Sequence, residues 1–263
     1  MRDIICYDGV EYDRLDFIEK FKGKERDTSK MKDYLVYTKE DLEKQGLPAN
    51  QLGTKYLEFN GQRYQLYYGF WGDRKLTEPW FGKVALVVDE KKNVNVLNLE
   101  TGELSYLRTI NPYETNHIVP ISKDFFVISG TEFGDFRYNI IAKGGFTIDT
   151  VVGRYINNYS KDGELTVKKY EGRGWVNEEF VGEITEKELL SRVKIAELNE
   201  TLISTVEQIN ALNTSSENTN GMELIKTLLD TVEQMTALGV SKETINSLID
   251  SAIKNENTDE LQN

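Results

Sequence analysis

The chain has little of the side-chain chemistry on which most metal sites and imidazole-dependent enzymes rely. Its 263 residues include one cysteine, Cys6, and one histidine, His117. A single cysteine cannot form an internal disulfide and indicates a reducing compartment. Without paired cysteines, the common zinc ligand sets cannot be assembled. We therefore expect Cys6 to be a buried strand residue, and we expect no metal and no cofactor.

Long apolar runs are also missing. No run of 18 or more apolar residues is present to span a membrane. The first residues, MRDIICYDGVEYD, are acidic and lack the apolar core of a signal peptide. The sequence therefore predicts a cytoplasmic protein with no membrane partner, in the host-cell cytoplasm if a phage encodes it.

Positive charge and aromatic residues are scarce in the last third. From Glu183 to the end there are 15 Asp and Glu against 6 Lys and Arg, which leaves 29 against 26 for residues 1–182. All 28 aromatic residues lie at or before Phe180. The two shifts predict a domain boundary near 182–186. We expect a mixed but mainly β recognition body over 1–182, a helical domain over 183–257 and a disordered tail over 258–263.

The acidic composition also bears on the choice of partner. Phosphate contacts require clustered Lys and Arg, so direct binding of nucleic acid is not expected. An acidic surface suits a basic groove on another protein instead.

An internal repeat is the strongest pattern that is present. Residues 197–212, ELNETLISTVEQINAL, recur at 223–238 as ELIKTLLDTVEQMTAL, with ten of sixteen positions identical at an offset of 26. The apolar positions fall three or four residues apart, which is typical of a helix with one apolar stripe. Such a helix must bury its stripe against the other copy, the body or another chain. We expect self-association through Leu198, Leu202, Val206, Ile209, Leu212, Leu224, Leu228, Val232, Met235 and Leu238.

The region before the repeat has the alternation and turns of a β-rich domain. Asn60-Gly61 is a strong hairpin signal between strands at 56–59 and 63–70. Further strands are expected at 4–7, 84–88, 94–99, 104–108, 125–129, 136–142, 146–152, 165–170 and 175–180, with helices at 13–21, 39–45, 185–212 and 222–238 and a third tail helix capped by Ser241. The predicted fold class is α+β: a curled antiparallel sheet, small barrel or sandwich, followed by an all-helical bundle.

Seven aromatic residues fall within Tyr64–Phe81, YQLYYGFWGDRKLTEPWF. One interpretation is a core strand followed by a loop whose Trp80 and Phe81 close the barrel or sandwich. The other takes 70–81 as an exposed contact, because Trp, Tyr and Arg dominate interface hot spots. On the second interpretation the partner-contact residues are Trp71, Arg74, Lys75, Trp80 and Phe81.

Catalytic patterns are weak. His117 lies in an expected loop and is interpreted as structural or exposed, and a Cys6/His117 dyad has no local signature. Residues 46–55, GLPANQLGTK, have the wrong glycine spacing and residue order for a phosphate loop. Glu132–Asp135 is interpreted as a turn rather than a cation site. The 44 acidic residues do not single out an acid and base pair. No catalytic residue is assigned.

Residues 162–181, DGELTVKKYEGRGWVNEEFV, are similar to the closing strand pair of bacterial Src-homology-3-like domains, in which a Gly-Trp-Val turn precedes the last strand. Together with Ile184–Glu188 they resemble endings of uncharacterised proteins from low-GC Gram-positive bacteria and their phages. The resemblance covers 162–188 and implies a phage or mobile-element origin and a small barrel or curled sheet.

These observations lead to three functional hypotheses. The preferred one is a non-enzymatic phage or mobile-element protein that oligomerises through its acidic helical tail and binds, and inhibits, a host protein such as a defence nuclease. The first alternative is a virion or tail-assembly protein. The second is a carboxylate-dependent hydrolase.

Overall fold

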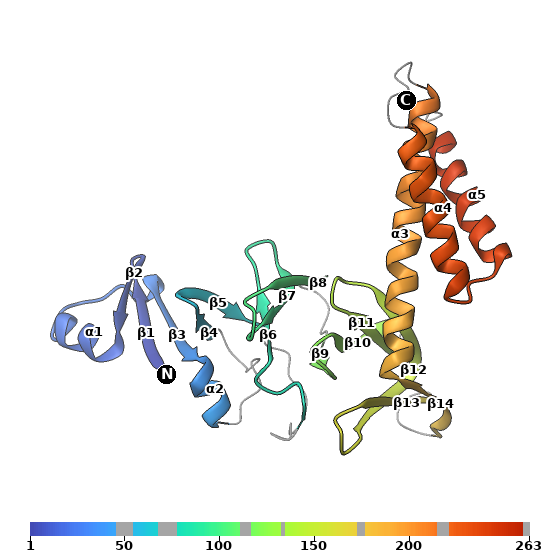
Figure 1. Cartoon of the computed structure of the whole chain (residues 1–263). Coiled ribbons are helices and arrows are strands. Elements are labelled where there is room, and N and C mark those ends of the chain that lie inside the picture. The colour runs from blue at the N-terminus through green and yellow to red at the C-terminus, as the bar shows by residue number, and fades with distance from the viewer. Residues whose placement is uncertain are drawn as a thin grey trace. The chain divides into compact units, whose positions relative to one another are not determined.

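A computed structural model describes residues 1–45, 55–67, 78–110, 117–132, 135–172, 177–214 and 221–259. The chain divides into two compact units, Met1–Thr185 and Glu186–Asn263 (Figure 1). The first unit is built of strands with two short helices, and the second is helical, so the fold is α+β. The first unit extends past residue 182 because its last strand continues to Thr185.

The first unit contains an eight-stranded sheet in the order β2-β1-β3-β4-β5-β6-β7-β8. All its neighbours are antiparallel except β3 and β4, which are parallel and joined through helix α2. The elements are β1 (Arg2–Tyr7), β2 (Val10–Asp13), α1 (Arg14–Phe21), a 3-10 turn η1 (Thr28–Lys30), β3 (Met31–Thr38), α2 (Lys39–Gln45), β4 (Lys55–Phe59), β5 (Gln62–Leu66), β6 (Val84–Val88), β7 (Asn93–Asn98) and β8 (Leu104–Thr109).

A second, six-stranded antiparallel sheet follows in the order β14-β13-β12-β11-β10-β9. Its strands are β9 (His117–Pro120), β10 (Phe125–Glu132), β11 (Asp135–Ala142), β12 (Thr147–Tyr159), β13 (Leu165–Glu171) and β14 (Glu179–Thr185). Neither sheet closes on itself, since β2 and β8 are edges of the first and β14 and β9 are edges of the second. The expectation of a small barrel is therefore wrong.

Three strands escape the sequence patterns. β2 has four residues and follows a tight turn at Asp8 and Gly9, whose φ angles are 51° and 80°. β3 is buried mainly near its end, so it lacks a clear alternation. His117, expected in a loop, starts β9 and pairs with Ser129. β14 begins four residues later than the strand predicted at 175–180.

The core of the first unit has two layers that meet at β6. Val84 and Leu86 of β6 pack with residues of both sheets, among them Ile118 and Phe126. Ala85 and Val87 point to the opposite face and pack with Leu57, Leu66, Tyr37, Leu42 and others. Because alternate residues of a strand face opposite sides, burial on both faces explains the unbroken apolar run VALVV.

The second unit consists of three helices, α3 (Glu186–Thr214), α4 (Gly221–Ala237) and α5 (Lys242–Asp259). α5 reaches two residues into the expected tail. The repeat extends to side-chain hydrogen bonds: the Thr201 hydroxyl donates to the Glu197 carbonyl (2.9 Å) and the Thr227 hydroxyl to the Glu223 carbonyl (3.1 Å). No helix in the described ranges has a stretch long and apolar enough to cross a membrane.

Candidate interaction surfaces

The aromatic segment is described only in part. Trp71, Arg74 and Lys75 lie outside the described residues. Trp80 is 3% exposed and belongs to the core that joins the two sheets. A side chain so buried offers no area to a partner, so the contact assignment of Trp80 is corrected to a core role. Phe81 is half-buried, with its ring centroid 6.2 Å from that of Trp80.

The repeated stripes pack on each other inside the helical unit. Leu198 and Leu202, early in the first copy of the repeat, share a core with Met235, late in the second copy, as expected for an antiparallel pair. Leu198, Leu202, Val206 and Met235 are at most 5% exposed, so they stabilise the unit itself and are not available to a second chain. Ile209, Leu212, Leu224, Leu228 and Val232 are half-buried, and Leu238 is exposed.

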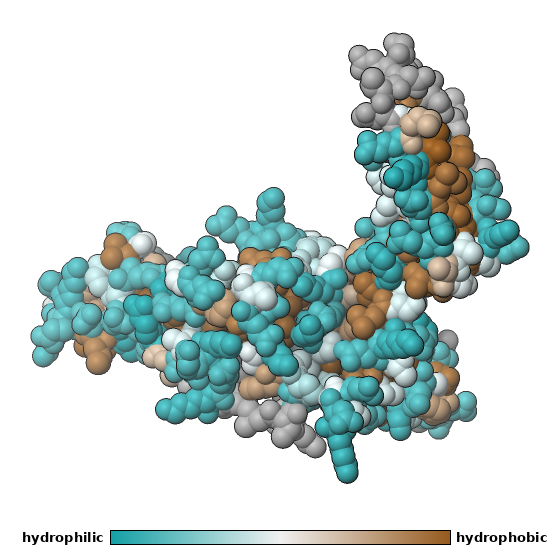
Figure 2. Space-filling model, in the orientation of Figure 1, coloured by the Kyte–Doolittle hydropathy of each residue, from teal (hydrophilic) through white to brown (hydrophobic). Residues whose placement is uncertain are grey.

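A different apolar surface remains open on α4. Met222, Ile225 and Leu229 are 84%, 48% and 63% exposed, and their spacing of three and four residues places them on one helix face. We call these three residues the α4 stripe. Figure 2 shows apolar surface running along the α4 and α5 region of the unit. The repeat does not indicate the α4 stripe, because the two copies differ at Ile225 and Leu229 and Met222 lies before the second copy.

Exposed carboxylates lie on α3 and α4. Glu197 and Glu200 on α3 and Glu223 on α4 are exposed. Glu197 and Glu223 are equivalent positions of the repeat. We call these three residues the acidic face; because the helices are antiparallel, Glu223 at the start of α4 lies toward the opposite end of the pair from Glu197 and Glu200. Lys194 lies 3.5 Å from Glu197, a contact in water that neutralises little of the negative potential.

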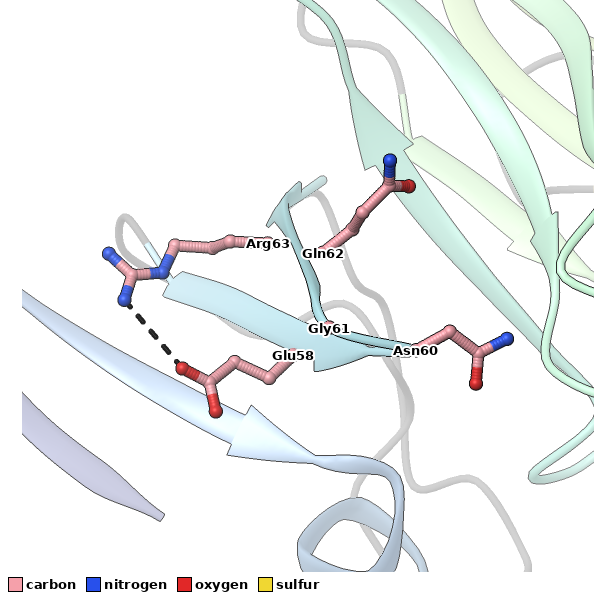
Figure 3. A pocket seen from close by; sticks show the side chains of 5 residues that line it. All are labelled: Glu58, Asn60, Gly61, Gln62 and Arg63. Atoms are coloured by element: carbon pink, nitrogen blue, oxygen red, sulfur yellow. Dashed lines mark ion pairs between the residues drawn. The ribbon is translucent and has the colours of Figure 1, made fainter.

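An open pocket of about 480 Å³ lies at the β4–β5 hairpin. It is lined by Glu58, Asn60, Gly61, Gln62 and Arg63. Figure 3 shows Glu58 and Arg63 directed toward each other, with 3.6 Å between the carboxylate and the guanidinium. Asn60 and Gly61 have φ angles of 49° and 76°, the two left-handed residues that a tight hairpin turn requires.

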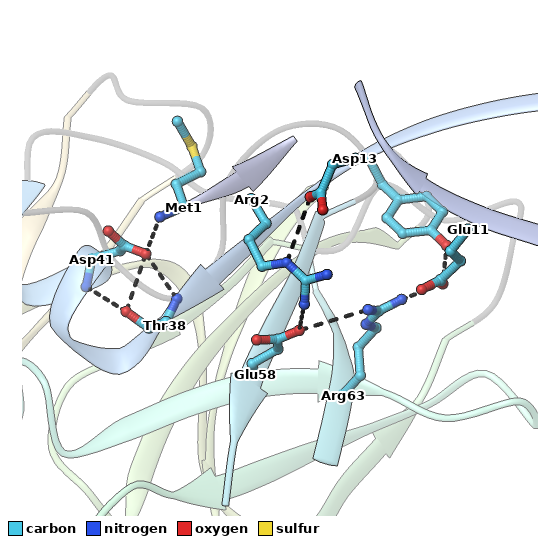
Figure 4. A network of polar contacts seen from close by, with 9 residues as sticks. Met1, Arg2, Glu11, Asp13, Thr38, Asp41, Glu58 and Arg63 are labelled. Carbon is cyan, nitrogen blue, oxygen red and sulfur yellow. Dashed lines mark hydrogen bonds and ion pairs between the residues drawn. The ribbon is translucent and has the colours of Figure 1, made fainter. Parts of the chain in front are cut away.

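Arg63 also belongs to a polar network on the first sheet (Figure 4). Arg2 lies 2.8 Å from Glu58 and 3.7 Å from Asp13. Arg63 lies between Glu58 and Glu11, and Glu11 also accepts a hydrogen bond from the Tyr34 hydroxyl. The Tyr34 and Tyr56 rings are 4.5 Å apart, and the Arg63 guanidinium lies near both. Carboxylates and guanidiniums thus alternate across β1, β2, β4 and β5.

The pKa values in this network follow from its geometry. Partial burial alone would raise the pKa of Glu11, but hydrogen bonds from Tyr34 and Arg63 outweigh it and hold that pKa below its ordinary value. Burial and the bond to Glu11 raise the pKa of the Tyr34 hydroxyl. Each carboxyl group in the described ranges whose pKa departs from its ordinary value has it lowered, whereas a general acid at neutral pH needs a raised one: Glu11, Asp27, Asp41, Asp89 and Glu243.

The other chemical candidates are spread over the first unit. Cys6 is half-buried on β1, where it pairs with Glu11 and Lys32, and His117 lies at the edge strand of the other sheet. Glu132 ends β10 and pairs with Asp135, which begins β11; the two residues between them lie outside the described residues. Within the described ranges, no three His, Cys, Asp or Glu side chains gather as a metal site would require.

Comparison with known proteins adds no relative. No protein-family model matches the chain, and no curated protein or solved structure matches it significantly. The surfaces described above are therefore the basis on which its function is argued.

Proposed function

We propose that the chain is a non-catalytic binding protein, encoded by a phage or mobile element, whose acidic helical unit occupies the basic nucleic-acid groove of a host protein such as a defence nuclease. The observation that carries the proposal is the acidic face, whose exposed carboxylates lie on adjacent helices of a unit with few cations. A nucleic-acid groove is lined with Lys and Arg, so it attracts such a surface.

Electrostatic steering makes this mode of binding fast and dependent on salt. A positive groove and a negative helical surface attract each other over about 8–10 Å at physiological salt. The acidic face also sits on regular helices whose core is packed, so little ordering entropy is lost on docking. The β body would then supply further contacts, with Arg74 and Lys75 remaining candidates for that role.

The test uses the full chain immobilised and exposed to lysate of a low-GC Gram-positive host. Captured proteins are identified by mass spectrometry, purified and assayed for nuclease activity against increasing amounts of the chain. We expect at least one captured nuclease whose activity ends at a fixed molar ratio. Excess double-stranded DNA should displace it, because both ligands compete for one groove.

A charge-reversal variant makes the test specific. Glu197→Lys, Glu200→Lys and Glu223→Lys combined should weaken capture by about tenfold or more, since close charge pairs at such interfaces couple strongly. The matched control reverses Asp16, Glu19 and Glu25, which are exposed residues in or near α1. It changes net charge equally and should bind like the parent. Equal binding by both variants, or capture insensitive to DNA, would refute the proposal.

A second candidate function, virion or tail assembly, is favoured by strand β14. It is an edge strand that exposes Phe180 (56%) and Val181 (47%), and exposed apolar edges pair readily with other strands. Rings or fibres of purified protein in electron micrographs, lost on Phe180→Lys, would support this candidate over the first.

A further inference from the structure

The two copies of the repeat are buried differently. α3 packs against both α4 and α5, whereas α4 packs mainly against α3 and touches α5 much less. On α3 the positions equivalent to the α4 stripe are Ala196, Asn199 and Ile203, and all three are half-buried. The same face is therefore covered in the first copy and open in the second.

A helical unit on its own would be more stable with an apolar side chain on its covered face and a polar side chain on its open face. The two faces have the opposite arrangement. The covered face contains Asn199, whose Oδ1 is buried without a hydrogen-bond partner in the described ranges. The open face contains Ile225 at the equivalent position. Burying an amide and exposing an isoleucine both cost free energy, so the open α4 stripe indicates a surface that is covered in the functional assembly.

We infer that a second copy of this chain covers the α4 stripe, with α4 of each copy packed antiparallel against α4 of the other. In the α3–α4 pair, α5 lies over α3 and leaves the equivalent place over α4 empty. The α4 stripe is therefore open to a further helix. A two-fold axis level with residues 227–228 brings Ile225 of each copy close to Leu229 of its partner.

Charge complementarity selects a second copy rather than an unrelated helix. Lys226 and Asp230 are exposed, lie one turn apart and flank the same edge of the α4 stripe. A two-fold axis perpendicular to both helices keeps that edge on the same side in each copy. Lys226 therefore faces Asp230 of the partner, and the pair occurs twice. An isologous interface requires this self-complementarity.

The first experiment measures the mass of the full chain by light scattering over a range of concentrations. We expect a dimer for the parent, and we expect Leu229→Glu to raise the dimer dissociation constant by about thirtyfold or more. Leu15→Glu is the matched control, because Leu15 is 80% exposed on α1 and lies outside the interface. Circular dichroism at 222 nm should be unchanged in both variants, since neither leucine is buried. A monomeric parent, or a dimer that survives Leu229→Glu, would overturn the inference.

The charge pair and the register are tested separately. Lys226→Asp alone should weaken the dimer, and adding Asp230→Lys should restore it. In a Cys6→Ser background, chains with Ile225→Cys mixed with chains with Leu229→Cys should oxidise to the mixed dimer in preference to either homodimer. A dominant Ile225→Cys homodimer would exclude the antiparallel register.

The dimer and the proposed host binding depend on different residues, so either hypothesis can be refuted without the other. Dimerisation uses the α4 stripe, and the proposed groove binding uses Glu197, Glu200 and Glu223. A chain that dimerises but captures no nuclease leaves the interface intact and refutes the proposed function. A chain that inhibits a nuclease as a monomer supports the proposed function and refutes the dimer.

Discussion

Glu11, Tyr34 and Arg63 show how single residues determine the polar surface of the first sheet. They lie on β2, β3 and β5, so the Tyr34 and Arg63 contacts to Glu11 connect strands that are not neighbours. A lowered pKa means that the fold favours the charged carboxylate. Glu11 therefore contributes stability above its ordinary pKa of 4.5, and this contribution is lost as pH falls through the lowered value.

This sign predicts a pH-dependent effect of Tyr34→Phe. At pH 7 the variant should be less stable than the parent by under about 1 kcal/mol, since the pair is partly exposed. The difference should shrink as pH falls through the lowered pKa and the Glu11 carboxyl becomes protonated. Thermal melting from pH 7 to pH 2 measures it, with Tyr12→Phe as control because Tyr12 contacts Lys20 instead of a carboxylate. A difference that stays constant from pH 7 to pH 2 would contradict the assigned role of Glu11.

For single residues, the sequence predicts local turns better than it predicts which distant side chains contact each other. Asn60-Gly61 indicates its hairpin because two left-handed residues in succession are rarely tolerated elsewhere. Trp80 carries no such local signal, since its burial depends on strands of both sheets. The Glu11 network is equally non-local, and no spacing in the sequence brings residues 11, 34 and 63 together.

Among the elements, β12 has a double role that depends on one glycine. Thr147–Val152 pair with β11, and Gly153–Tyr159 pair with β13. Gly153, at the change of partner, has φ +150°, and a Cβ there would lie 2.2 Å from the Tyr170 carbonyl oxygen. Only glycine allows the two backbones to approach so closely.

Gly153→Ala should therefore destabilise the first unit by about 2–4 kcal/mol, from backbone strain and a clash with main chain that cannot rotate away. Urea unfolding followed by near-ultraviolet circular dichroism measures the loss. Gly182→Ala is the matched control, because Gly182 has φ +153° with no atom within 4 Å of the added Cβ. It should cost about 1 kcal/mol, from strain alone. Equal losses in the two variants would show that contact with Tyr170 is unimportant.

The sequence predicts helices and strands where the apolar residues repeat over a long segment and lie on one face. The repeat predicts both helices. It gives the packing of the two apolar stripes on each other as one of three possibilities. It does not indicate that α5 covers one copy and leaves the other open, because that choice depends on packing among three helices. β3 is missed for a related reason, since its burial is concentrated at one end.

At the scale of the whole chain, each unit has its own core and its own spectroscopic signal. All aromatic residues lie in the first unit, so near-ultraviolet circular dichroism reports that unit alone. The helices dominate the signal at 222 nm. The two signals therefore follow the two units separately in one sample.

Leu202→Asp should unfold the helical unit while leaving the near-ultraviolet signal unchanged. Leu202 is fully buried, and a carboxylate there should cost about 3–5 kcal/mol. Leu190→Asp is the control, because Leu190 is 51% exposed on the same helix and should keep the 222 nm signal. Simultaneous loss of both signals in Leu202→Asp would show that the units unfold as one.

The order of strands in the sheets also affects how the chain folds during synthesis. From β4 to β8 and from β10 to β14, each strand pairs with the strand that precedes it in the chain. Pairings between successive strands close short loops, which lowers contact order and speeds folding. As residues leave the ribosome at about 5–20 per second, each new strand can add to the edge left by the last. Each edge is thus protected from aggregation by the next strand, and both sheets can form before α3, α4 and α5 emerge.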